Sequence, residues 1–183
     1  MTPPESPPEP RAIERWIVGI TISVGILVYV CFDGRFAIPD WGNSFRLDDT
    51  QSFTMDFRRE SFGKTLYSIS IAGDGQATLR RQRVDPGGET AQLALSPQQI
   101  QAVAEAVTRH RLSSLSKEYY RLGILDGSQW YLQISQGTGQ KSVFFDNNFP
   151  SAIRAFAADI QKILKSQGYD KLDWQPVNAS NAP

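Results

Sequence analysis

The side chains that carry most acid–base and metal chemistry in proteins are scarce in this chain. It contains one histidine, His110, and one cysteine, Cys31. Zinc and haem sites draw mainly on these residue types, so the sequence argues against ordinary sites of either kind. His110 stands at the expected end of a helix, where a histidine interacts favourably with the helix dipole. We therefore expect a structural or solvated role for His110, and we predict no catalytic residue, no metal and no cofactor.

Carboxylates offer the other route to catalysis. Asp146 and Asp126 could form the acid–base pair of a hydrolase if the fold brought them together. The segment 146–148 could serve as a ligand loop, but its Asp-Asn-Asn sequence is also typical of a turn followed by a helix N-cap. The acidic pair at 48–49 could hold a cation or be solvated charge, and no EF-hand spacing accompanies it. A hydrolase is thus an alternative interpretation.

Arginines form the candidate interaction surface. The residues in question are Arg58, Arg59, Arg80, Arg81 and Arg83, which lie on or beside two predicted strands. If these strands come together, the arginines make a positive edge that could contact anionic lipid or a protein partner. A charged edge that discourages strand-to-strand aggregation explains them equally well. The whole chain carries 19 basic and 19 acidic residues, so the basic excess expected of a nucleic-acid-binding protein is missing.

An uncharged stretch near the N-terminus predicts a membrane span. Residues 16–32 contain no charged side chain, and as a helix they would rise about 26 Å, close to the thickness of the bilayer core. The residues that follow do not offer the small-x-small pattern of a signal-peptide cleavage site. We predict an uncleaved transmembrane helix within 15–33. Because Arg15 abuts the span, we expect the domain outside the cytoplasm, although the reverse orientation is physically allowed.

The rest of the chain divides around this span and leaves room for one domain with its own core. We expect a disordered proline-rich tail at 1–14, a juxtamembrane linker at 34–49, a domain at 50–167 and a C-terminal tail at 168–183. In the linker, we expect Phe36, Ile38 and Trp41 to lie on the bilayer surface.

Alternating apolar and polar residues predict half-buried strands in the domain. The pattern covers 53–57, 67–71, 77–80, 130–134 and 142–145, with a further short strand at 92–95. Asp74-Gly75 predicts a tight hairpin turn between the second and third strands, so the first three strands should form an antiparallel meander.

Two helices are expected. Ser96 and Gln99 match a capping box with Pro97 between them, which predicts a helix from 97 to about 110. Pro150 should open a last helix with an apolar stripe that reaches Leu164. The predicted fold class is α+β: an antiparallel sheet of five or six strands with two helices on one face, preceded by a single transmembrane helix.

The stretch 58–75 resembles the opening of a bacterial envelope-associated domain family of unknown function. In that family an arginine and a Cys-x-Gly-x-Cys-Pro-x-Tyr segment precede a strand and an Asp-Gly turn. The matching residues are Gly63, Tyr67, Asp74 and Gly75, whereas both family cysteines are absent, with Ser61 and Thr65 at or beside their places. The resemblance covers roughly 53–164, implies association with the envelope and supplies no functional residues.

These observations favour a membrane-tethered, non-enzymatic binding or interaction module of a bacterial envelope. Its expected partners are the membrane and another envelope protein, with no nucleic acid. An accessory subunit of a larger membrane complex is one alternative, and the carboxylate-dependent hydrolase is the other.

Overall fold

The computed structural model describes residues 34–41, 45–48, 52–61, 64–81, 88–124 and 127–169. The predicted proline-rich tail, the predicted span at 16–32 and nearly all of the predicted C-terminal tail lie outside these residues. In the part of the chain that the structure describes, no helix is both long enough and apolar enough to cross a bilayer.

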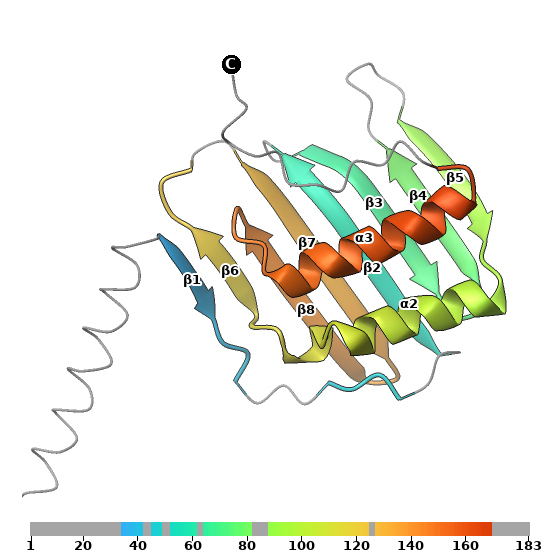
Figure 1. The fold of residues 1–183 in the computed structure, drawn as a ribbon, viewed down its shortest axis with the longest axis horizontal. Coiled ribbons are helices and arrows are strands. Elements are labelled where there is room, and N and C mark those ends of the chain that lie inside the picture. Colours follow the sequence, from blue (N-terminus) through green and yellow to red (C-terminus); the bar gives the residue numbers. More distant parts are fainter. Residues whose placement is uncertain are drawn as a thin grey trace, which may run out of the picture.

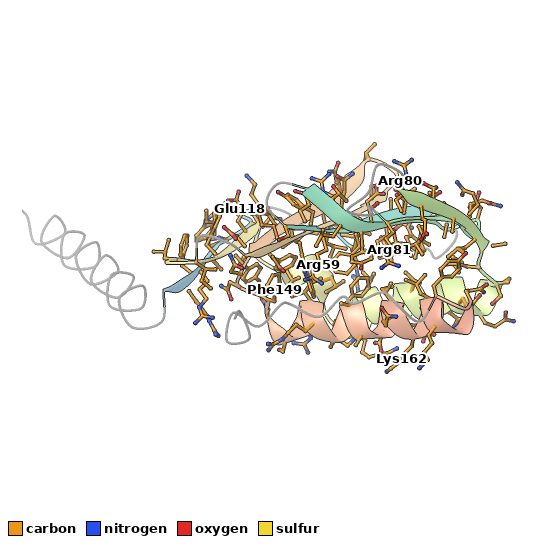
Figure 2. All side chains as sticks on the ribbon, turned by 90° about the horizontal axis from the view of Figure 1, so that it is seen from above. Arg59, Arg80, Arg81, Glu118, Phe149 and Lys162 are labelled. Atoms are coloured by element: carbon orange, nitrogen blue, oxygen red, sulfur yellow. The ribbon has the colours of Figure 1, made fainter. Side chains whose placement is uncertain are left out.

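The described residues form one mixed sheet of eight strands in the order β1-β6-β8-β7-β2-β3-β4-β5. Helices α2 and α3 both cover the same face of this sheet (Figures 1 and 2). The elements are β1 (Arg35–Ile38), β2 (Phe53–Ser61), β3 (Lys64–Ala72), β4 (Gln76–Arg81), β5 (Glu89–Ala94), α2 (Pro97–Arg109), the short 3₁₀ helix η1 (Leu112–Ser114), β6 (Glu118–Arg121), β7 (Ser128–Gln136), β8 (Gly139–Asp146) and α3 (Ser151–Ser166).

The predicted sheet of five or six antiparallel strands is therefore wrong in strand number and in pairing. Strands β1 and β6 add an edge that was not expected, and β6 pairs parallel to β8. β1 lies in the segment expected to be a linker, and β6 lies in a stretch for which no element was predicted. Both strands have only four residues, and neither shows alternating burial. Their pairing is therefore set by contact with β8 and with each other, which no local pattern reveals.

The meander and the two hairpins agree with the sequence pattern. β2, β3 and β4 are antiparallel neighbours, and β7 pairs antiparallel to β8. Gly75 adopts φ +93° in the β3–β4 turn, and a Cβ there would lie 2.7 Å from the Leu95 carbonyl oxygen. Glycine is required at this position for both reasons.

Helix α2 begins as predicted with a capping box, and α3 begins directly after Pro150 as predicted, but without a side-chain cap. The Gln99 amide donates to Ser96 Oγ at 3.2 Å, and the Ser96 amide donates to Gln99 Oε1 at 2.8 Å, which completes the capping box. No side chain caps α3, whose cap position is Pro150. The cap role considered for 146–148 is therefore wrong. Asn148 instead donates to the carbonyl oxygens of Phe36 and Tyr120, and so holds the β1–β6 edge.

The core lies between the sheet and the two helices. Along β2, the side chains of Phe53, Met55 and Phe57 are buried on the helix side, and the intervening side chains are exposed. Phe57 packs edge-on against Trp130 with ring centroids 5.5 Å apart, and against Phe156 of α3 at 5.8 Å. Central strands and α3 are thus joined by one aromatic contact network.

A buried ion pair fastens the segment after β1 to this core. Lys141 is 1% exposed, and its Nζ donates to Asp40 Oδ2 at 2.6 Å and to the carbonyl oxygen of Leu115. Lys141 follows the same alternation as Val143 and Phe145, which also face the helices. The strand periodicity itself therefore places this lysine in the core, and Asp40 compensates its charge.

Candidate interaction surface on the open face of the sheet

No helix of the described ranges lies on the face of the sheet opposite α2 and α3, and Glu118 and Arg80 extend from this face (Figure 2). A hollow of about 660 Å³ lies on this face. One cross-strand row of residues in direct register runs through the hollow, from β6 to β4. This row, called the groove row below, consists of Glu118, Phe144, Tyr131, Arg58, Ser68 and Arg80.

Aromatic rings continue the groove row towards β1. Tyr120 stacks on Phe36 with ring centroids 5.0 Å apart, and it meets Phe144 edge-on at 5.6 Å. Phe144 in turn lies 4.8 Å from the ring of Tyr131. The guanidinium carbon of Arg58 lies 4.1 Å from the centroid of that ring, which is a cation–π contact. The rings are half-buried, so their positions are fixed while part of each remains accessible.

The charged groups of this face are arranged unevenly. Arg58 forms an ion pair with Glu60 at 3.2 Å. Among the described residues, no carboxylate lies within ion-pair distance of Arg80, whose side chain is exposed. Glu118, at the other end of the groove row, accepts a hydrogen bond from the Tyr120 hydroxyl. The row thus ends in an acid on β6 and in an arginine on β4.

Hydrogen bonding and burial perturb three acids of this face. The hydrogen bond to Glu118, helped by burial, raises the pKa of Tyr120 to about 12. Burial also raises the pKa of Tyr131. Burial raises the pKa of Asp146 too, although hydrogen bonds from Gln129 and Asn147 oppose the shift. Burial contributes to all three pKa shifts, because this face is partly shielded from water.

The five predicted arginines do not form one surface. Arg80 lies on the open face, whereas Arg59 and Arg81 point to the helix side (Figure 2). Arg58 is in register with Arg80 through Ser68 and so shares the open face, and Arg83 lies outside the described residues. Arg59 is buried and donates to Ser128 Oγ at 3.3 Å. Arg81 lies 5.7 Å from the ring centroid of Tyr67. The period-two alternation of strands separates adjacent residues, and this signal was available in the sequence.

The residues considered for catalysis or metal binding are held in other arrangements. His110 Nε2 lies 2.8 Å from Asp159 Oδ2, and this carboxylate also meets Arg109 and Lys162, each at 3.2 Å. His110 therefore joins the end of α2 to α3. Asp126, the proposed partner of Asp146, lies outside the described residues.

The acidic pair at 48–49 is only partly described. The Asp48 backbone amide donates to Gln136 Oε1 at 2.8 Å, and Asp49 lies outside the described residues. Within the described ranges, no group of three His, Cys, Asp or Glu side chains is placed to hold a metal ion.

Sequence reasoning missed most of the groove row. The aromatic residues Tyr119, Tyr120, Trp130 and Tyr131 could be seen in the sequence as surface able to bind sugar or peptide, with packing as the default interpretation, but Phe144 was recognised only as a member of a strand, and Glu118 was in a stretch without a predicted element. The row exists because β6, β8, β7, β2, β3 and β4 bring six distant segments into register.

A scan against protein-family models finds none that matches this chain. A search of the curated proteins finds no match either. The resemblance of 58–75 to an envelope-associated family therefore stays a prediction, and the function is argued from the surface itself.

Proposed function

We propose that this protein is a membrane-tethered, non-enzymatic binding module, and that the groove row binds a segment of another envelope protein. The observation that carries the proposal is the row itself: aromatic rings and arginines lie in register across the sheet face opposite α2 and α3. Tyrosine, phenylalanine and arginine are enriched at protein interfaces, where a few of them supply most of the binding energy.

The extent of the row favours a polypeptide partner over a small ligand. From Glu118 to Arg80 the row crosses five inter-strand spacings of about 4.8 Å, about 24 Å in all. A standard interface covers about 800 Å² on each partner, and a row of this length is compatible with one. The hollow supplies depth at its centre.

The charges of the row define the partner's chemistry. Arg80 offers an exposed guanidinium, so a carboxylate of the partner can form a bidentate pair with it. The rings of Tyr131 and Phe144 offer apolar surface at the other half of the row. The partner segment should therefore carry an acidic residue about 15 Å from an apolar or aromatic one, since three strand spacings separate β7 from β4.

Site-specific photo-crosslinking of the full-length protein in its own membranes tests this proposal. A benzoylphenylalanine in place of Ser68 stands in the groove row, and one in place of Arg154 stands on the exposed side of α3. We expect a discrete protein adduct from the first site and none from the second. The yield of the adduct should fall about tenfold or more in Tyr131→Ala and in Arg80→Glu, because each substitution removes a central contact.

Two results would count against the proposal. One is an adduct pattern that is the same at both sites, and the other is an adduct at Ser68 that survives both substitutions in a protein that remains folded by circular dichroism. If the adduct proves to be a subunit of a membrane complex, the protein is the accessory subunit considered above, with the same binding face.

A further inference from the structure

The two ends of the sheet differ in charge. At the end where β1 begins, the first or last residues of the strands include Arg35, Arg121, Arg81 and Lys64, together with Glu89 and Asp146. At the opposite end, the strand-terminal residues are Ile38, Glu118, Gly139, Gln136, Phe53, Ala72, Gln76 and Ala94, among which Glu118 alone is charged. Basic residues are therefore concentrated at one end of the sheet.

Two of these arginines face each other. Arg35 on β1 and Arg121 on β6 are direct cross-strand partners, so their side chains extend from the same face of neighbouring strands. The oxygens of a phosphate group match the fork geometry of guanidinium groups, so two arginines side by side are suited to hold one phosphate group.

The same end of the sheet is where the predicted membrane span would leave the bilayer. One residue, Asp33, separates the end of the 16–32 stretch from Gly34. The chain from Phe32 to Gly34 therefore spans about 7 Å at most. The Leu122 amide donates to the Gly34 carbonyl oxygen at 2.7 Å, and Leu122 is 54% exposed. This corner must lie at the lipid headgroups if the span is in place.

We propose that Arg35, Arg81 and Arg121, called the arginine rim, bind the phosphate groups of anionic lipids, so that the strands stand upright on the bilayer. The proposal rests on the membrane tether of the proposed function and adds the lipid contact and the orientation. Arg35 is exposed, and Arg81 and Arg121 are partly exposed, whereas Arg59 at the same end is buried and takes no part. The rim extends from β1 to β4, six strand spacings or about 29 Å.

This orientation also assigns places to the exposed apolar residues. Leu122 lies beside Gly34 and would enter the interface. Ile38 and Trp41 follow the opposite end of β1, about 10 Å or more further along the strand direction. They would then stand away from the lipid, in contrast to the position on the bilayer surface expected from the sequence.

Quenching of a fluorophore by lipid headgroups tests the orientation in the full-length protein. Cys31 is replaced by serine, and a label is attached through Thr90→Cys or Ala94→Cys. These two exposed residues lie on one face of β5 but near its two ends, about 13 Å apart. The protein is reconstituted into phosphatidylcholine vesicles with or without phosphatidylglycerol, and both mixtures contain a lipid with a nitroxide on its headgroup.

With phosphatidylglycerol present, we expect the label at Thr90 to be quenched several-fold more than the label at Ala94. Arg81→Gln and Arg121→Gln should each lower the ratio of docked to undocked protein about fivefold, the amount typical of one basic residue near an anionic surface. The matched substitution Arg154→Gln, on the exposed side of α3, should leave the ratio unchanged.

The experiment distinguishes failure of the proposed membrane tether from failure of the proposed lipid contact of the arginine rim. Protein that does not float with the vesicles after a high-salt wash would overturn the tether, and the rim proposal would fall with it. Protein that floats but shows equal quenching at the two labels, or quenching independent of both phosphatidylglycerol and the rim arginines, would overturn the rim alone. Stronger quenching at Ala94 would establish the opposite orientation.

Discussion

Substitutions at the buried ion pair should have unequal effects, depending on which partner is removed. Lys141 is 1% exposed at its side chain and Asp40 is 20% exposed, with Nζ and Oδ2 2.6 Å apart. At this distance the Coulomb attraction is about 6 kcal/mol for an effective dielectric constant of about 20. Most of that gain offsets the cost of removing the ammonium group from water.

Asp40→Asn leaves the ammonium group buried, with the Leu115 carbonyl oxygen and a neutral amide as neighbours. Removal of one partner of a buried pair costs about 3–5 kcal/mol. Because Asp40 is partly exposed, water can replace some of its contact, and we expect a loss of about 3 kcal/mol. Lys141→Met removes the buried charge at similar volume and leaves a carboxylate that water can reach. Its cost should be about 1 kcal/mol.

Thermal unfolding of the full-length protein in detergent, followed by circular dichroism, measures both effects. For a domain of roughly 120–135 residues a change of 1 kcal/mol shifts Tm by about 4 °C, so Asp40→Asn should lower Tm by about 12 °C and Lys141→Met by about 4 °C. The Tm of the double variant should be close to that of Lys141→Met, because the buried charge that Asp40 compensates is absent from both. Equal losses in the two single variants would refute the reasoning, since they would mean that Lys141 is solvated when Asp40 is removed.

Two further predictions concern titrating groups. The hydrogen bond to Glu118 holds the pKa of Tyr120 near 12, so the phenolate absorbance of Tyr120 should appear at higher pH than that of ordinary tyrosines. Glu118→Gln should bring the midpoint of this absorbance change closer to about pH 10. An unchanged midpoint would contradict the assigned cause. The hydrogen bond from His110, followed by the contact with Lys162, lowers the pKa of Asp159. The ionised carboxylate therefore stabilises the folded state at pH values above its unfolded pKa near 4. This contribution is lost as the pH falls through the lower pKa of the folded state. Asp159→Asn should therefore cost about 1 kcal/mol at neutral pH and nothing at strongly acidic pH, as chemical denaturation at several pH values would measure; an equal cost at both extremes would assign the effect to packing.

The sequence by itself determined the central strands, the two helices and which of their faces are buried. Phe53, Met55 and Phe57 repeat with the period of a strand, and the capping box at Ser96 and Gln99 needs only residues three apart. These signals are local, because hydrophobic alternation and helix caps depend on neighbours along the chain. The same alternation places Arg59 and Lys141 on the buried side.

Only the tertiary structure decided the edge of the sheet and the candidate surfaces. β1 and β6 are too short to show a period, and the parallel pairing of β6 with β8 joins segments that no turn connects. The groove row and the arginine rim both depend on this strand order, since each gathers residues from strands far apart in the chain. Pairing between distant segments is a property of the whole packed sheet, and a linear pattern of residue types does not encode it directly.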